Sequence, residues 1–160
     1  MRISRCFAAG LVAILVVFGI AASPLGQTEA KAAQSNATCI DEKAFMTGIG
    51  FKVYVPVVSG SRNCLLSVSS YKKDATIALQ KSIRGCYLQN LGTTGQYKDG
   101  IDGVFGAKTT AGLKHAQNHK PGASVTPDGI YGNKTHNKLY FADSWHADAG
   151  GNCIPDDTKI

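Results

Sequence analysis

Two histidines have a spacing that can bind a metal ion. His115 and His119 are four residues apart in a segment expected to be helical, so both side chains share one helix face. The zinc-protease motif requires a glutamate directly after the first histidine, and Ala116 occupies that position. His136 and His146 could complete a site only if the fold brought them alongside. We expect solvent-exposed histidines and no metal, with a small zinc-dependent hydrolase as an alternative.

Asp102 and Asp128 are the acidic pair that a glycosidase mechanism would need, with carboxyl groups about 5–10 Å apart. Each aspartate is followed by glycine, however, and an aspartate in such a turn commonly accepts hydrogen bonds from its own backbone. The chain also lacks the Gly-x-Ser-x-Gly sequence that positions many serine nucleophiles. We therefore expect turns rather than catalysis, no enzymatic activity and no cofactor.

Cys39, Cys64, Cys86 and Cys153 form an even set, which is typical of two disulfide bonds in a small exported domain. No Cys-x-x-Cys pair favours a zinc site. A helix expected at 74–85 spans roughly 18 Å and disfavours Cys64–Cys86, because bonded cysteines keep their Cα atoms within about 7 Å. Of the two remaining arrangements, we favour Cys39–Cys64 with Cys86–Cys153.

Residues 1–32 are typical of a secretory signal peptide. Basic residues precede an apolar run of 16 residues at positions 7–22, and Ala30-Lys31-Ala32 has the form of a cleavage site. The run is short for a membrane span, which needs roughly 20 residues. We expect cleavage near Ala32 to remove Cys6 and to release a secreted chain that does not contact a membrane.

The remaining chain, residues 33–160, has the size of one domain and a mild positive charge. The whole chain has 17 Lys/Arg and 11 Asp/Glu; residues 1–32 contain three and one of these, which leaves 14 and 10 and a net charge near +4. The basic residues are scattered, which argues against a nucleic-acid footprint. The charge suits a polyanionic surface such as a cell wall without requiring one.

An eight-residue sequence occurs twice, as DGVFGAKT from Asp102 to Thr109 and as DGIYGNKT from Asp128 to Thr135. The Asp-Gly pair predicts a turn, and the apolar-aromatic pair after it is expected to pack in the core. The second glycine permits a backbone angle that other residues resist. A helix is expected to begin at the Lys-Thr pair, so the repeat predicts a turn that leads into a helix, used twice.

The predicted fold is mainly α, a small disulfide-stapled three-helix bundle with an N-terminal extended arm. Periodicity predicts helices at 74–85, 108–119 and 134–141, with Asp74 as an N-cap of the first and Leu139 facing inward in the third. Residues 51–59 and 64–70 predict extended segments that pair with each other, the first interrupted by Pro56. The expected boundaries are 1–32 for the signal peptide, 33–63 for the arm, 64–141 for the helical module and 142–160 for the tail.

Three motifs in this order resemble the peptidoglycan-binding domain family. They are TIALQKSI from Thr76 to Ile83, DGVFGAKTTAGLKHAQ from Asp102 to Gln117, and PDGIYGNKTHNKL from Pro127 to Leu139. The resemblance covers about residues 64–141, and the flanking cysteines are similar to a secreted actinobacterial version of the domain. It implies a fold of three helices that docks on cell-wall peptidoglycan. Thr76 departs from the family pattern, which often has valine there.

Residues in or beside the two turns are the expected binding surface, because aromatic rings stack on sugars while lysines and amides bind carboxylate and acetamido groups. We expect a groove between the starts of the second and third helices, where free N–H groups suit stem-peptide carboxylates. Phe105 and Trp145 are expected to pack in the interior, and Tyr131 fits either the core or the surface. The expected binding residues are Tyr97, Asp102, Lys108, Thr109, Asp128, Tyr131, Asn133, Lys134 and Thr135.

Taken together, the sequence predicts a secreted, cell-wall-associated module that binds peptidoglycan, its glycan strands or its stem peptides, without catalysis. It would act alone or with a separate protein partner, and nucleic acid is not expected to bind. A protein-binding, inhibitor or recruitment module on the same fold is the first alternative, in which the arm at 51–59 adds a strand to a partner. A zinc-dependent wall hydrolase is the second.

Overall fold

The computed structural model describes residues 37–68, 70, 72–119, 125–143 and 152–155. All of them belong to one compact unit, Ala32–Ile160, which contains the hydrophobic core and both disulfides. A unit with its own core and its own cross-links is able to fold alone. The predicted signal peptide, Trp145 and His146 lie outside the described residues.

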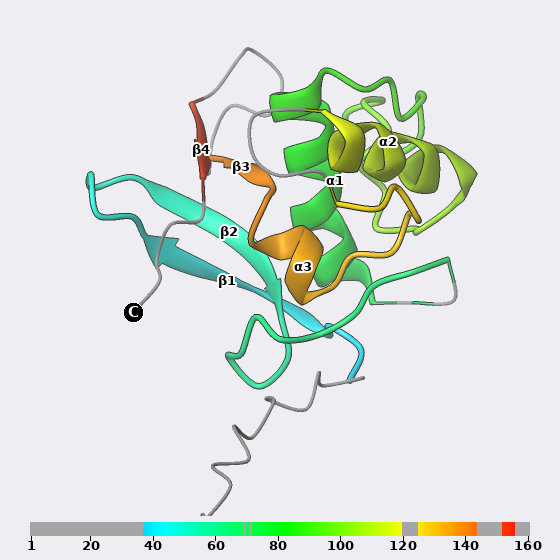
Figure 1. The fold of residues 1–160 in the computed structure, drawn as a ribbon. Coiled ribbons are helices and arrows are strands. Elements are labelled where there is room, and N and C mark those ends of the chain that lie inside the picture. Colours follow the sequence, from blue (N-terminus) through cyan, green and yellow to red (C-terminus); the bar gives the residue numbers. More distant parts are fainter. Residues whose placement is uncertain (1–36, 69, 71, 120–124, 144–151, 156–160) are drawn as a thin grey trace, which may run out of the picture. The chain divides into compact units, whose positions relative to one another are not determined.

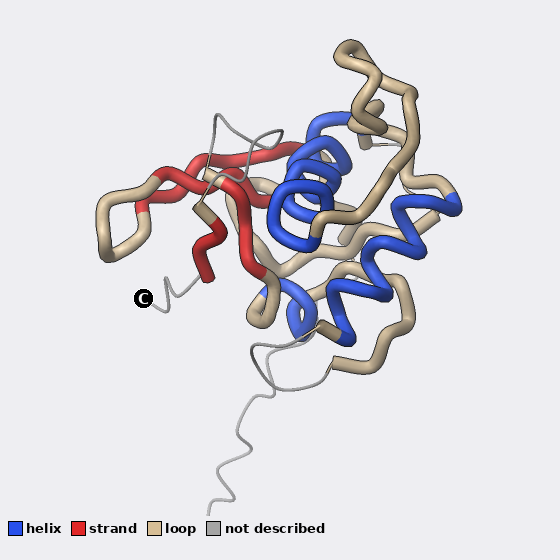
Figure 2. Tube along the Cα trace, turned by 90° about the horizontal axis from the view of Figure 1, so that it is seen from above, coloured by secondary structure: helices blue, strands red, loops and turns tan. Residues whose placement is uncertain are grey.

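Two strands come first along this unit, three helices follow and two short strands end it, and the loop that joins the first two strands extends away from the helices (Figures 1 and 2). The first hairpin pairs continuously along both strands, with Asp41 opposite Val57 and Met46 opposite Lys52. A single bridge between Val53 and Asp143 links this hairpin to the second sheet. The elements are β1 (Asp41–Met46), β2 (Lys52–Val57), α1 (Lys73–Tyr87), α2 (Ala107–Asn118), α3 (Asn133–His136), β3 (Tyr140–Ala142) and β4 (Cys153–Pro155).

The prediction of a mainly α three-helix bundle is wrong. Two small antiparallel sheets, β1–β2 and β3–β4, share the core with the helices, so the fold is an α/β mixture. The third predicted helix, 134–141, ends after one turn at His136, and the chain continues into β3. The Cys86–Cys153 disulfide joins β4 to α1, and the backbone of Tyr140–Ala142 pairs with β4 instead of extending the helix. Leu139 nevertheless faces inward, as predicted.

The predicted pairing of residues 51–59 with 64–70 is also wrong. β2 pairs with β1, whose charged residues hide any apolar alternation in the sequence. The segment after Cys64 makes other contacts: Cys39 N–H donates to the Leu65 carbonyl at 2.9 Å, and Leu66 exchanges two backbone hydrogen bonds of 2.9 Å with Tyr131. These bonds attach the N-terminal segment to the second repeated turn.

α1 is the element on which the others pack, and it contacts both sheets and α2. Its inward face contains Ala75, Leu79 and Ile83, which are fully buried. Gly112 lets α2 approach closely: a Cβ atom there would lie 2.6 Å from Ile83 Cγ2. The predicted N-cap is wrong, because α1 starts one residue earlier and Asp74 lies in its first turn. A carboxylate still interacts favourably with the helix dipole at that position.

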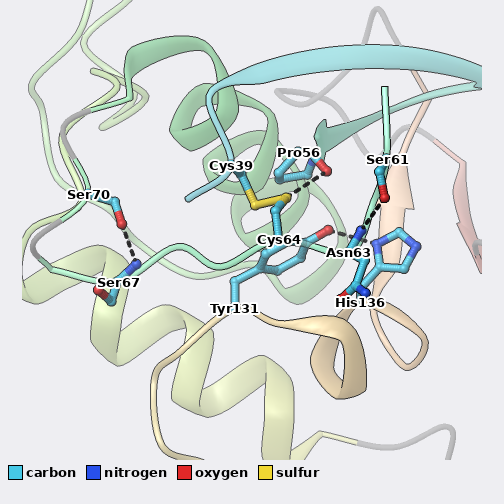
Figure 3. Close-up of a disulfide and its surroundings, with 9 residues drawn as sticks. All are labelled: Cys39, Pro56, Ser61, Asn63, Cys64, Ser67, Ser70, Tyr131 and His136. Atoms are coloured by element: carbon cyan, nitrogen blue, oxygen red, sulfur yellow. Dashed lines mark hydrogen bonds between the residues drawn. A yellow bond between two sulfur atoms is a disulfide. The ribbon is translucent and has the colours of Figure 1, made fainter. Parts of the chain in front are cut away.

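The favoured disulfide arrangement is confirmed, with Cα–Cα distances of 5.0 Å for Cys39–Cys64 and 5.4 Å for Cys86–Cys153. The first bond joins the segment before β1 to the segment that contacts the second turn (Figure 3). Two disulfides indicate an oxidising, extracellular setting. Among the described residues, no helix has the length and apolar character needed to cross a membrane.

Candidate functional site

The first repeated turn closes around a glutamine of α1. Gln80 is only 1% exposed, and its Oε1 accepts from the backbone N–H groups of Asp102 at 3.1 Å and Gly103 at 2.9 Å. Its Nε2 shares two hydrogens among three acceptors, which are Asp102 Oδ1 at 2.9 Å, the Val104 carbonyl at 3.1 Å and Thr109 Oγ1 at 3.1 Å. We call this arrangement the first glutamine clasp.

The second repeated turn has the same arrangement around a glutamine of α2. Gln117 is 5% exposed, and its Oε1 accepts from Gly129 N–H at 2.9 Å. Its Nε2 contacts Asp128 Oδ1 at 2.8 Å, the Ile130 carbonyl at 3.0 Å and Thr135 Oγ1 at 3.0 Å. This is the second glutamine clasp, and it matches the first atom for atom except for one backbone N–H.

The two clasps give the repeated residues a structural role. Asp102 Oδ1 accepts from the N–H two residues later at 2.9 Å, and Asp128 Oδ1 does so at 2.8 Å, which confirms the predicted Asp turns. Thr109 and Thr135 are 2% and 3% exposed, so their hydroxyl groups are not accessible to a ligand. Both glutamines lie within the motifs that resemble the peptidoglycan-binding domain family, but neither was expected to have a role of its own. The signal was a glutamine on the helix before each Asp-Gly turn.

Hydrogen bonding also determines the ionisation of Asp102. Burial by itself raises the pKa of this carboxyl, but donors from Gln80, Thr94 and the Val104 N–H outweigh burial and hold the pKa below its usual value. Thr94 Oγ1 donates to the other carboxylate oxygen at 2.7 Å. Asp102 is therefore an ionised, well-satisfied acceptor, which does not suit a general acid.

A cleft of about 690 Å³ lies beside the first clasp, between α1, the loop before the first turn and the sheets. Tyr97 lines it from the loop and is 75% exposed. Lys73 and Lys81 line it from α1, and Tyr54 lines it from β2. The cleft thus combines aromatic rings with cationic groups.

The charged groups of the cleft differ in how far they are already engaged. Asp99 is 6% exposed, and its Oδ1 accepts from Ile101 N–H at 2.9 Å. Lys81 Nζ lies 4.0 Å from Glu42 Oε2 and 5.8 Å from the Tyr54 ring centroid. Burial raises the pKa of Glu42, while the Lys81 charge opposes that rise. Asp99 and Lys81 therefore already have partners within the protein, whereas the Tyr97 side chain is exposed.

Among the described residues, the two turns line separate cavities rather than one groove. Asp102 and Tyr97 line the cleft beside α1, whereas Asp128, Lys134 and Thr135 line a separate hollow of about 490 Å³ beside α3. Because they line different cavities, the two aspartates do not form the acidic pair considered from the sequence. Two further expected binding residues, Lys108 and Asn133, are exposed and line neither cavity.

Tyr131 belongs to the core. Its side chain is fully buried, and its hydroxyl oxygen lies 2.7 Å from His136 Nδ1, as Figure 3 shows. The two rings meet edge to face at 6.0 Å between centroids. Tyr131 therefore offers no ring face to a ligand, although it was among the expected binding residues. Phe105 is 3% exposed, which confirms its predicted core position.

The histidines are divided between two environments. His115 and His119 are exposed on α2 and stack with ring centroids 5.3 Å apart, and His119 also meets Tyr87 edge to face. His136 is buried beside Tyr131. Within the part of the chain that the structure describes, no group of three or more His, Cys, Asp or Glu side chains is placed to hold a metal ion.

Comparison with known proteins finds no matching family model and no significant similarity to a curated protein or a solved structure. Function must therefore follow from the chemistry of the site, since a fold alone does not determine function.

Proposed function

We propose that the protein binds cell-wall peptidoglycan non-covalently through the cleft beside α1. The observation that carries this proposal is the combination of the exposed Tyr97 with Lys73 and Lys81 around one cleft. Peptidoglycan offers sugar rings and stem-peptide carboxylates. A tyrosine ring provides an apolar face with a polar tip, and a lysine forms charge-assisted hydrogen bonds with a carboxylate.

The resemblance of the three motifs to the peptidoglycan-binding domain family supports the same ligand. The glutamine clasps show that the motif's Gln, Asp, Gly and Thr residues bond to one another. Their role is to fix the turns, so the ligand contacts are assigned to the exposed side chains of the cleft. The two disulfides suit an extracellular protein, and association with the cell wall is part of the proposal.

The test is co-sedimentation of residues 33–160 with insoluble peptidoglycan sacculi over a salt series. Retention is expected to survive about 0.5 M salt, where the Debye length is only a few Å and diffuse charge attraction is screened. Tyr97→Ala combined with Lys73→Met is expected to weaken binding at least tenfold, about 1.4 kcal/mol. Methionine keeps the Lys73 stem, which packs against Gly103, and removes only the charge.

The matched control is Lys108→Ala with Lys134→Ala, which removes two exposed cations outside the cleft. This variant is expected to bind like the wild type. If it loses binding and the Tyr97 variant does not, the ligand occupies the groove expected from the sequence and the assignment to the cleft fails. Absence of wild-type retention at every salt concentration would reject peptidoglycan as the ligand.

The second candidate function, binding of a secreted protein partner, is favoured by the open edge of β1. Among the described residues this strand pairs only with β2, so its outer edge can accept an extended segment. The arm at 51–59 is less suited than expected, because β2 has β1 on one side and the Val53–Asp143 bridge on the other. Failure to bind sacculi would direct attention to this edge.

A further inference from the structure

The loop between β1 and β2 carries an exposed apolar tip, which we define as Met46, Ile49 and Phe51. These side chains are 58%, 71% and 37% exposed. The loop is well bonded: Thr47 N–H donates to the Phe51 carbonyl at 2.8 Å, and Phe51 N–H donates to Thr47 Oγ1 at 3.1 Å. Gly50 adopts a φ of 85°, which closes the turn. The internal bonds of the loop therefore hold the apolar side chains outward.

The hairpin supports the tip firmly and away from the helices. Val53 and Val55 of β2 are fully buried and fix the base of the hairpin in the core. In both views the loop lies at the side of the described chain opposite to α2 (Figures 1 and 2). Neither the tip nor Thr47 lines the cleft beside α1. The tip is thus separate from the proposed peptidoglycan site.

Lysines lie on both strands that lead to the tip: Lys52 is paired with Met46, and Lys43 lies three residues before Met46, directly after Asp41 and Glu42. Both lysines are exposed, and no Asp or Glu occurs between Lys43 and Asn63. Arg62 lies over the Phe45 ring, with its guanidinium carbon 4.5 Å from the ring centroid. One carboxylate, that of Asp143, lies near the hairpin because Asp143 is bridged to Val53. Its Oδ2 accepts a hydrogen bond from Asn152.

We propose that the apolar tip docks on an anionic lipid bilayer. Apolar side chains enter the boundary between headgroups and acyl chains, while nearby lysines attract the anionic headgroups. Three partly exposed side chains offer far less than the roughly 800 Å² per partner of a standard protein interface, and the lysines beside them complement an anionic lipid surface. This proposal is independent of peptidoglycan binding and departs from the expectation that the processed chain does not contact a membrane.

The experiment measures binding of residues 33–160 to sedimenting vesicles of phosphatidylcholine, with and without phosphatidylglycerol. Each engaged lysine contributes about fivefold to binding at an anionic surface, so anionic vesicles are expected to bind about 25-fold more tightly than neutral ones. Met46→Ser with Ile49→Ser is expected to weaken binding to anionic vesicles at least tenfold. The matched control is Val68→Ser, which removes a 65% exposed apolar side chain outside the tip and leaves binding unchanged.

The charge contribution is tested separately. Lys43→Gln with Lys52→Gln is expected to reduce binding to anionic vesicles about 25-fold at low salt, whereas Lys114→Gln with Lys138→Gln changes it less than threefold. Circular dichroism melting confirms that every variant is folded. Equal binding to neutral and anionic vesicles, no binding to either, or full binding by the tip variant overturns the proposal. Dimerisation that the tip variant abolishes, seen by sedimentation velocity, would assign the tip to a second copy and also overturn it.

Discussion

Replacing Gln80 with methionine tests the energetic role of the first glutamine clasp. Methionine has a similar volume, so the substitution leaves little cavity, and the cost arises from polar groups that lose their partner. The buried Gly103 N–H loses its acceptor, and the Val104 carbonyl loses a donor. A buried polar group without a partner costs about 1–3 kcal/mol. The Gly103 N–H contributes its full cost and the part-buried Asp102 N–H a fraction of it. We therefore expect the free energy of unfolding to fall by about 3 kcal/mol.

The second clasp provides an internal comparison. Gln117→Met removes the acceptor of only one backbone N–H, that of Gly129, and we expect a loss of about 2 kcal/mol. The exposed Gln96 is the matched control, because its replacement by methionine changes surface only and is expected to stay within about 0.5 kcal/mol of the wild type.

Urea unfolding with both disulfides intact measures these differences. With a slope of about 1–3 kcal/mol per molar urea, a loss of 3 kcal/mol lowers the midpoint by roughly 1–3 M. A loss below 1 kcal/mol for Gln80→Met would refute the reasoning, because it would show that water or the turn itself satisfies these groups. A larger loss for Gln117→Met than for Gln80→Met would refute the count of backbone donors.

Two further predictions concern other polar groups of the same region. Thr76→Val is expected to stabilise the fold by about 1 kcal/mol in the same urea assay, because Thr76 is fully buried and its Oγ1 has no hydrogen-bond partner among the described residues. Thr109→Val is the control and should destabilise, and stabilisation by both substitutions would contradict the assignment. Asp102 has a lowered folded-state pKa, so its contribution to stability is present above its unfolded pKa of about 3.9 and is lost as the pH falls through the folded value. Urea midpoints between pH 2 and 6 should therefore fall more steeply with acid in the wild type than in Asp102→Asn. Burial raises the pKa of Glu42, which therefore acts in the opposite direction, equally in both proteins. Parallel curves for the two proteins would contradict this prediction.

The parts of the fold that local sequence determines were predictable. α1 and α2 follow from apolar periodicity, and their observed bounds differ from the predicted ones by no more than a few residues. The length of α1 also disfavoured a Cys64–Cys86 bond, and the structure pairs both cysteines elsewhere. Each of these inferences used only residues close in sequence or the length of one helix.

The parts that depend on distant partners were not predictable. β1 reads DEKAFM, in which charged residues hide the strand until β2 lies beside it. β3 is a strand because β4, beginning at Cys153, pairs with it, and periodicity cannot report a partner so far along the chain. The cleft has the same origin: Tyr54, Lys73 and Tyr97 come from three elements that only the tertiary fold brings together.

The clasps explain why one short chain contains the same octet twice. An isolated helix shorter than about 15 residues is marginal in water, because nucleation is unfavourable and few hydrogen bonds follow it. α2 has 12 residues and α3 only four, so neither forms reliably from propensity alone. In each case the helix begins at the residue after the second glycine of the octet, and its first turn supplies the threonine that the glutamine holds. The clasp therefore stabilises the first turn of the helix by tertiary contact. A device of this kind is needed once for each short helix, whichever ligand the cleft binds.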